Sequence, residues 1–257
     1  MTPSRLHLAR ALRLTLGLLL TPLAASAQAP TQAAEDEEPV RSVSVDLNGD
    51  GKKDAATLDW KEGAATYTLQ VGKSRLKGRG DEGYVGELTV VDLDKGDAFK
   101  ELRVDVEMEW DERRVDLYGF DGKQLKLLGI LHKPIQAHGN GVVLSDEWRG
   151  FWSQRDKYVL NREQWRLDLV PQPFYYVGDE IRVTASFPLL FSPKGKDVVA
   201  QLAANTKIRV LAADPSVSDK QSWFLVKSST GLVGWVASES LTRNTEGLLF
   251  SDSAPSP

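Results

Sequence analysis

The chain has 257 residues, of which 41% are hydrophobic and 26% are charged, and its formal net charge is −4. This composition is typical of a soluble globular protein, and the length allows two domains with separate cores. The absence of cysteine excludes disulfides, thiolate metal sites and thiol nucleophiles.

The first 27 residues have the pattern of a secretory signal peptide. Three arginines precede or interrupt a short apolar run at 14–20, and a small-residue cleavage site ends at Ala27. A membrane anchor would need about 20 apolar residues, and Pro22 comes too early for one. We therefore expect export to the periplasm or the cell exterior, with no transmembrane anchor left after cleavage.

Two segments of the mature chain are polar and of low complexity. Residues 28–39 are rich in Ala, Gln and Pro and carry an acidic run, and residues 244–257 end in Ser and Pro. We expect a disordered spacer and a disordered tail. Signal cleavage would remove three arginines and change the net charge from −4 to −7, which argues against nucleic acid or an anionic membrane as a partner.

Residues 46–54 are the most chemically specific stretch of the chain. Oxygen-bearing side chains occupy its first, third, fifth and ninth positions, and alternate residues of a tight loop can surround a hard cation such as Ca²⁺. The predicted ligands, with Lys52 contributing its main-chain carbonyl, are Asp46, Asn48, Asp50, Lys52 and Asp54. The alternative is a hairpin loop that turns the chain without binding an ion.

The loop pattern D-x-N-x-D-G-x-x-D lies between two segments that look like strands, at 42–45 and 55–60. This unit resembles the calcium loop of FG-GAP/VCBS repeats, the integrin-like half-blades of β-propellers. The resemblance implies a strand–loop–strand unit with calcium as its cofactor. An EF-hand fits less well, because its flanks are helices and its twelfth position is a bidentate Glu, whereas that position here is Thr57.

A second, weaker copy of this unit follows at 91–101. Val45-Asp46-Leu47-Asn48 aligns with Val91-Asp92-Leu93-Asp94, but one inserted residue displaces Asp97 from the fifth position and Glu101 replaces the closing Asp. The candidate ligands of a second, weaker ion site are Asp92, Asp94, Asp97 and Glu101. A solvated acidic turn fits the same residues.

Short segments of alternating hydrophobicity continue at 66–71, 114–118 and 125–131, and Asp-Gly at 121–122 marks a hairpin turn. No stretch has sustained helical periodicity, so the mature protein is predicted to be all-β. Two half-blade repeats cannot close a propeller, which needs four or more blades. For residues 40–177 we therefore predict a hairpin-rich sheet or small sandwich built from half-blade-like repeats.

Residues 146–177 are rich in aromatic side chains. Large aromatics favour strands and close the core of small β domains, which is the interpretation we favour. The alternative is a platform on which sugar rings stack. The residues concerned are Trp148, Phe151, Trp152, Tyr158, Trp165, Phe174, Tyr175 and Tyr176.

Residues 180–243 contain five or six short apolar segments and end in the pattern W-x-x-V-K…G-x-x-G-W-V, from Trp223 to Val236. This ending resembles that of bacterial SH3 (SH3b) domains. The resemblance implies a small SH3-like barrel that targets its protein to peptidoglycan or to a peptide of the cell envelope, with Trp223 and Trp235 as the nearest candidates for ligand contact. The alternative is that both tryptophans lie in the barrel core.

The sequence gives little support to an enzyme. It has no HExxH, GxSxG or phosphate-binding loop, and the two histidines beyond the signal segment, His132 and His138, lie in one predicted loop. We therefore predict an exported, non-enzymatic binding protein that is stabilised by Ca²⁺ and docks to the cell envelope through its C-terminal domain. The alternatives are a scaffold that contacts another protein and a cell-wall hydrolase of unrecognised type.

Overall fold

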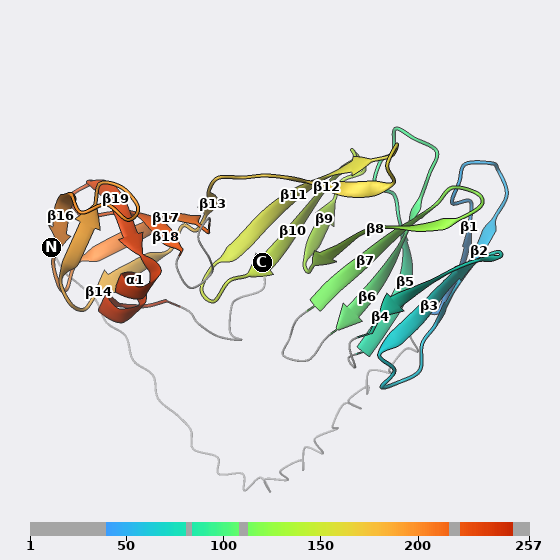
Figure 1. Cartoon of the computed structure of the whole chain (residues 1–257), viewed down its shortest axis with the longest axis horizontal. Helices are drawn as coiled ribbons and strands as arrows, with labels where there is room; N and C mark the ends of the chain where they lie inside the picture. The colour runs from blue at the N-terminus through green and yellow to red at the C-terminus, as the bar shows by residue number, and fades with distance from the viewer. Residues whose placement is uncertain (1–39, 81–83, 108–112, 216–221, 249–257) are drawn as a thin grey trace, which may run out of the picture. The chain divides into compact units, whose positions relative to one another are not determined.

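The computed structural model describes residues 40–80, 84–107, 113–215 and 222–248. These ranges contain three four-stranded antiparallel sheets, one eight-stranded antiparallel sheet and one short helix, so the all-β prediction is confirmed (Figure 1). No helix within them is long and apolar enough to cross a membrane. The predicted signal peptide and spacer, and residues 249–257 of the predicted tail, lie outside the described ranges.

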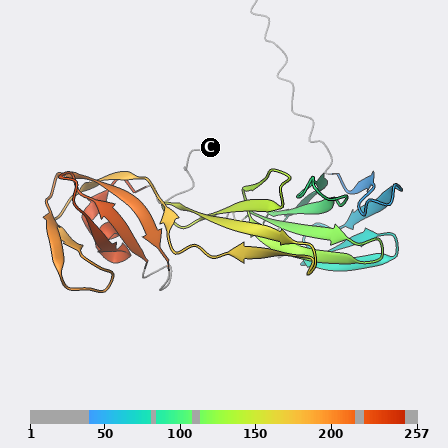
Figure 2. The same cartoon turned by 90° about the horizontal axis from the view of Figure 1, so that it is seen from above.

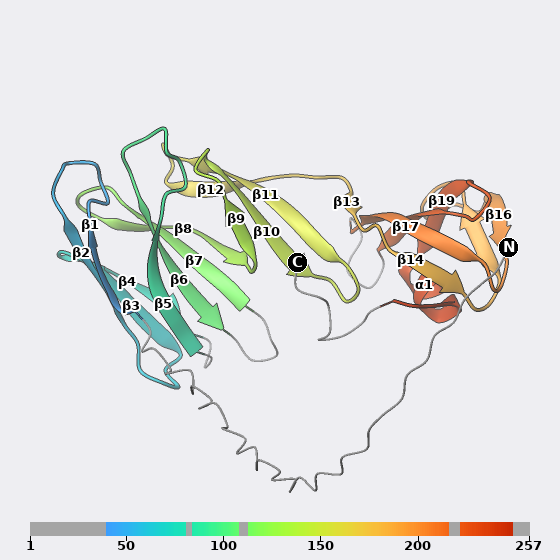
Figure 3. The same cartoon turned by 180° about the vertical axis from the view of Figure 1, so that it is seen from behind.

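Each four-stranded sheet is a meander, in which consecutive strands of the chain are antiparallel neighbours (Figure 3). The first sheet contains β1 (Ser42–Val45), β2 (Asp54–Asp59), β3 (Thr66–Val71) and β4 (Ser74–Arg79). The second contains β5 (Tyr84–Val91), β6 (Glu101–Glu107), β7 (Arg113–Phe120) and β8 (Leu125–His132). The third contains β9 (Ile135–Ala137), β10 (Val142–Trp148), β11 (Ser153–Asn161) and β12 (Arg166–Val170).

The division into three sheets corrects the predicted single sheet or small sandwich. The reason lies in the second sheet, whose strand β7 is buried at every position except its first. Tyr118 and Phe120 of β7 pack in a core shared with the first sheet, whereas Val115 and Leu117 pack in a core shared with the third. A strand that is buried on both faces needs a neighbouring layer on each side.

The predicted strand–loop–strand unit occurs three times in this fold. The acidic loops at 46–53 and 92–100 connect the first two strands of the first and second sheets. Residues 138–141 connect β9 to β10 at the corresponding place in the third sheet. This third loop contains no carboxylate, so the acidic pattern does not reveal it in the sequence.

A hydrogen-bonded network lies in the core between the first and second sheets. Tyr67 of β3 donates its hydroxyl hydrogen to Asp116 Oδ2 at 2.6 Å, and the Tyr118 hydroxyl lies 2.6 Å from that of Tyr67. Arg114 donates to Asp116 Oδ1 at 3.0 Å. Burial raises the pKa of both tyrosines, that of Tyr118 to about 12. These buried polar groups therefore satisfy one another, as a low-dielectric core requires.

The C-terminal sheet forms around a separate core, and its strands curve around that core (Figure 2). The strand order is β16-β15-β19-β18-β17-β14-β20, and β13 pairs with β17. The bounds are β13 (Tyr175–Tyr176), β14 (Glu180–Val183), β15 (Phe187–Leu190), β16 (Val198–Leu202), β17 (Lys207–Asp214), β18 (Trp223–Lys227), β19 (Val233–Ala237), α1 (Ser238–Asn244) and β20 (Thr245–Glu246). Strands β13 and β20 lie outside the predicted range 180–243, yet both pair within this sheet.

The β10–β11 hairpin of the third sheet contributes to the C-terminal core. Phe151 and Trp152 in its turn are each 5% exposed and belong to the same hydrophobic cluster as the C-terminal strands. The ring of Phe151 lies 5.1 Å from that of Phe224 in β18. These two aromatics therefore have the predicted core role, whereas Trp148 and Tyr176 are 44% and 80% exposed.

Replacing Tyr67 with Phe removes one hydroxyl from the core, and with it a hydrogen bond to Asp116 and one to Tyr118. We expect the free energy of unfolding to fall by about 1–3 kcal/mol, the usual cost of leaving a buried polar group unsatisfied. Urea denaturation measures this change. The control is Tyr84→Phe at a 44% exposed position, which should change stability by less than about 0.5 kcal/mol. Equal stability of the two variants would contradict a structural role for the network.

Candidate functional site

Asp46 organises the first acidic loop. Its two carboxylate oxygens accept hydrogen bonds from the N–H groups of Gly49 at 2.7 Å and Gly51 at 2.8 Å. Both glycines have positive φ, +77° and +82°, which lets the backbone fold back over the carboxylate. Desolvation opposes ionisation, but these hydrogen bonds outweigh it and lower the pKa of Asp46 below its usual value. The loop therefore holds an ionised carboxylate at neutral pH.

The other predicted ligands take part in the same pattern. Asn48 Oδ1 accepts a hydrogen bond from Asp50 N–H at 2.9 Å, and Asp50 Oδ1 accepts one from Lys52 N–H at 2.8 Å. Asp54 Oδ2 accepts one from Leu47 N–H at 3.0 Å, which closes the loop. A carboxylate offers about four acceptor sites, so these side chains use only part of their capacity. The structure thus brings the predicted ligands into one hydrogen-bonded loop.

The donors of this loop fit a hard cation in their chemistry, because they comprise three carboxylates, an amide oxygen and a main-chain carbonyl. Across the described ranges, no group of three or more His, Asp or Glu side chains lies close enough together to hold a metal ion. Calcium binding would therefore require the carboxylates to turn from the backbone toward a shared point. The calcium site stays a prediction.

The second acidic loop repeats this hydrogen-bond pattern. Leu93 N–H donates to Glu101 Oε2 at 2.9 Å, which is the counterpart of the bond that closes the first loop. Gly96 N–H donates to Asp94 Oδ1 at 3.0 Å. Glu101 is fully buried, and this burial raises its pKa despite the hydrogen bonds that it accepts. The second loop thus contains a closing carboxylate that needs a counter-charge.

Arg162, from the turn between β11 and β12, supplies that counter-charge. Its guanidinium donates to Asp97 Oδ2 at 2.8 and 3.0 Å and to Glu101 Oε1 at 2.8 Å. It also lies over the rings of Phe99 at 4.8 Å and Trp165 at 5.0 Å, which are cation–π distances. A side chain of the protein therefore provides the positive charge of the second loop, and a metal ion there would have to displace it.

Three of the four predicted ligands of the second loop have hydrogen-bond partners, and the fourth has a carboxylate oxygen without one in the described part of the chain. Asp94, Asp97 and Glu101 accept hydrogen bonds, whereas Asp92 Oδ1 is buried without a partner among the described residues. Arg162 Nη1 is likewise buried without one. The sequence gives no signal for Arg162, because it is distant along the chain and arginine is also common on protein surfaces.

Backbone hydrogen bonds join the three loops in series. Lys100 N–H, in the second loop, donates to Leu47 O of the first at 3.0 Å. Gly141 N–H, in the third loop, donates to Leu93 O of the second at 2.8 Å. The three loops are therefore neighbours in space, and each is connected to the next by a backbone hydrogen bond.

The two tryptophans predicted to contact a ligand lie on the outer face of the C-terminal sheet. The register pairs Trp223 of β18 with Ala237 of β19, and Trp235 with Leu225, so both tryptophans share one face. Phe224, between the paired residues, points to the opposite side and is buried in the core. Both tryptophans are half-buried, so the alternative of two core tryptophans does not describe this structure.

Trp235 belongs to a line of apolar side chains across this outer face. Phe174 adds a ring 5.6 Å from that of Trp235, inclined at 45°. Phe174 is 49% exposed and Tyr176 is 80% exposed, so solvent reaches the line. Strand pairing places five side chains next to one another on this face: Tyr176, Ala212, Leu225, Trp235 and Leu190. These five, with Phe174 and Trp223 beside them, are called the outer aromatic row.

No family model, curated protein or solved structure matches the chain. The FG-GAP/VCBS and SH3b resemblances therefore rest on the local residue patterns.

Replacing Arg162 with Met keeps an apolar stem against the neighbouring aromatic rings but removes the charge that neutralises Glu101. We expect the free energy of unfolding to fall by about 3–5 kcal/mol, the usual cost of removing one partner from a buried ion pair. Urea denaturation measures this loss. The matched control is Arg166→Met, which removes an exposed ion pair with Asp168 and should cost less than about 1 kcal/mol.

The pH dependence gives a second readout of the Arg162→Met variant. Without the guanidinium, the pKa of Glu101 rises further above its value in the unfolded chain. The native state then binds more protons than the unfolded state, so stability falls as the pH rises and recovers as the pH is lowered toward the ordinary pKa of glutamate. A further Glu101→Gln substitution should remove this recovery. A loss that is equal at acidic and neutral pH in the single variant would contradict this role for Glu101.

Proposed function

We propose that the protein is an exported, non-enzymatic binding protein that docks to the peptidoglycan of the cell envelope through the outer aromatic row. The observation that carries the proposal is the exposure of aromatic side chains on the outer face of the C-terminal sheet. Trp223 and Trp235 are half-buried there, and Phe174 packs on Trp235 while remaining 49% exposed. Large aromatics with one face open to solvent are a common basis of recognition surfaces.

The charges beside the outer aromatic row favour a ligand that carries carboxylates. The strand pairing places Glu180, Arg209 and Lys227 side by side on the same outer face. Arg209 and Lys227 are both exposed. Glu180 forms ion pairs with Lys207 at 2.7 Å and Arg209 at 3.5 Å, so it neutralises only part of this positive charge. Aromatic faces beside cations suit the carboxylate-bearing peptides of a cell wall.

The close approach of strands in the C-terminal sheet supports the SH3b resemblance. A Cβ at Gly234 would lie 2.6 Å from Leu190 O and 2.8 Å from Leu189 Cγ, so only glycine fits there. Gly231, in the preceding turn, has φ +90°. The resemblance implies a tight turn at Gly231 and a close strand approach at Gly234, and the backbone at both positions is compatible with it.

We further propose that Ca²⁺ acts as a stabiliser of the first sheet. The oxygen-lined loop connects β1 to β2, and the outer aromatic row lies on other strands. The ion would therefore contribute to folding rather than to ligand contact. The second loop already has Arg162, so the proposal concerns the loop at Asp46 alone.

A scaffold function is the second candidate, because the apolar surface extends past the row. Val198, which pairs with Leu190, is 52% exposed, and the neighbouring Phe191 is 73% exposed. Clustered exposed apolar side chains also suit a protein partner. Binding to purified peptidoglycan separates the two functions.

Purified peptidoglycan sacculi should carry the protein into the pellet on sedimentation. Trp235→Ala and Phe174→Ala should each weaken this binding by about tenfold or more, as expected for aromatics that anchor an interface. The control is Tyr84→Ala, at an aromatic position of similar exposure on β5. Full binding by both row variants would exclude the row as the docking surface. Failure of the unchanged protein to sediment would exclude peptidoglycan and favour the scaffold function.

Ca²⁺ should raise the melting temperature by a few degrees, and chelator should reverse the shift. Extracellular calcium sites commonly have dissociation constants of about 10⁻⁴–10⁻³ M. At a Ca²⁺ concentration ten times the dissociation constant, binding to the native state should raise the free energy of unfolding by about 1.4 kcal/mol. Asp50→Ala should abolish most of the shift, because it removes a predicted ligand, whereas Asp94→Ala in the second loop should preserve it. A melting temperature indifferent to millimolar Ca²⁺ would show that the loop only turns the chain.

A further inference from the structure

A cavity of about 590 Å³ lies between strands β10 and β11 and the segment 172–179. Small-molecule sites commonly have volumes of about 300–1,000 Å³. This cavity is referred to as the aromatic cleft, and its lining includes Trp148, Tyr176, Asp146, Arg155, Gln172 and Asp179.

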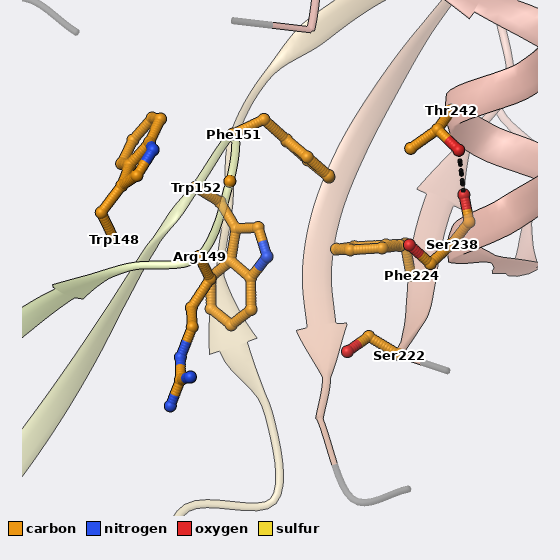
Figure 4. A pocket seen from close by; sticks show the side chains of 9 residues that line it. Trp148, Arg149, Phe151, Trp152, Ser222, Phe224, Ser238 and Thr242 are labelled. Atoms are coloured by element: carbon orange, nitrogen blue, oxygen red, sulfur yellow. Dashed lines mark hydrogen bonds between the residues drawn. The ribbon is translucent and has the colours of Figure 1, made fainter. Parts of the chain in front are cut away.

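Phe151 and Trp152 line both the aromatic cleft and a smaller cavity of about 350 Å³. Figure 4 shows the smaller cavity, with Phe151 directed toward Phe224 and the Trp148 ring standing apart from them. Phe151 and Trp152 are each 5% exposed because they are packed in the C-terminal core. Trp148 is 44% exposed, so its ring is open to a ligand.

Tyr176 gives the cleft a second open ring, from a different sheet. It lies in β13 and is 80% exposed. Gly178, with φ +88°, makes room for this ring, since a Cβ there would lie only 2.5 Å from the Tyr176 hydroxyl oxygen. The ring therefore lies close to the Gly178 backbone and is still widely exposed to solvent.

Hydrogen bonds hold three polar side chains of the cleft in place, and a fourth, Asp179, has none among the described residues. Asp146 and Arg155 form a two-point ion pair with both N–O distances at 2.7 Å, and Gln172 donates from Nε2 to Arg155 O at 2.8 Å. Asp179 is half-buried, and its carboxylate has no hydrogen bond or ion pair within the described ranges. Burial raises the pKa of Asp179, as expected for an acceptor that lacks a donor.

We propose that the aromatic cleft binds a pyranose unit of a neutral glycan. The apolar C–H face of a sugar ring can pack on the open rings of Trp148 and Tyr176. Its hydroxyl groups can donate to the carboxylate of Asp179 and the amide oxygen of Gln172. A cleft with aromatic walls and a few fixed polar groups has the general composition of a small-molecule site.

The exposure of the rings favours a sugar over a quaternary ammonium ion. A cage for such a cation needs several aromatic faces open to one point. Trp152 is only 5% exposed, and the Tyr175 hydroxyl is engaged with Asp156 Oδ1 at 2.7 Å. Among the described aromatic residues that line the cleft, Trp148 and Tyr176 are the widely exposed ones, and two open rings suit the stacking of a sugar ring. The cleft shares Tyr176 with the outer aromatic row, but Trp223 and Trp235 do not line it, so sugar binding in the cleft does not require the proposed docking function.

Titration of the protein with chitotetraose, cellotetraose and maltotetraose tests the proposal. Each tryptophan gives one indole N–H signal in ¹⁵N NMR, and Trp148→Phe identifies the signal of Trp148. We expect at least one oligosaccharide to move the Trp148 signal. Tyr176→Ala should weaken its binding by about tenfold or more, and Asp179→Asn, which keeps the shape of the side chain, by about threefold to tenfold.

Two controls separate the cleft from other surfaces. Phe191→Ala removes a 73% exposed aromatic outside the cleft, and Trp235→Ala alters the outer aromatic row; both should leave the oligosaccharide affinity unchanged. The proposal is overturned if none of the three sugars moves the Trp148 signal, or if the Tyr176 and Asp179 variants bind as the unchanged protein does. It is also overturned if choline moves that signal and the sugars do not. If the unchanged protein binds a sugar but not sacculi, the docking proposal is contradicted and the proposal for the cleft is retained.

Discussion

The second sheet packs against a neighbouring sheet on each of its faces, and this constraint determines how the N-terminal sheets are held together. Polar groups on its strands need partners inside the protein, because an unpaired buried charge costs several kcal/mol. On one face, Asp116 bonds to Tyr67 of the first sheet. On the opposite face, Glu101 bonds to Arg162 of the third. The same groups that would destabilise an isolated sheet therefore connect it to both of its neighbours.

The two acidic loops show two ways in which one backbone arrangement can balance its negative charge. In the first loop, backbone N–H groups approach the carboxylates, and the acceptor sites that remain suit a hard cation. In the second loop, Arg162 provides the positive charge from a distant turn. A guanidinium is always charged and forms directional hydrogen bonds, so the second loop has its counter-charge from a side chain of the protein.

The β10–β11 hairpin links the stability of the C-terminal sheet to its two candidate surfaces. Phe151 and Trp152 of this hairpin complete the C-terminal core, and Trp148 remains exposed beside them. Tyr176 belongs both to the outer aromatic row and to the aromatic cleft, so the two surfaces meet at β13. A ligand that joins a sugar to a carboxylate-bearing peptide would have the chemistry to occupy both surfaces.

The sequence by itself determined the all-β class, the acidic loops and the alternation of side chains along each strand, because these depend on neighbours in the chain. A strand has a side-chain period of two, and an Asp- or Asn-rich loop folds on its own amides, whatever surrounds them. Only the tertiary structure decided that the N-terminal half forms three sheets, that Arg162 meets Glu101, and that Trp148 is exposed while Trp152 is buried. Burial and counter-charge depend on which distant segments come together, and local spacing carries no information about that choice.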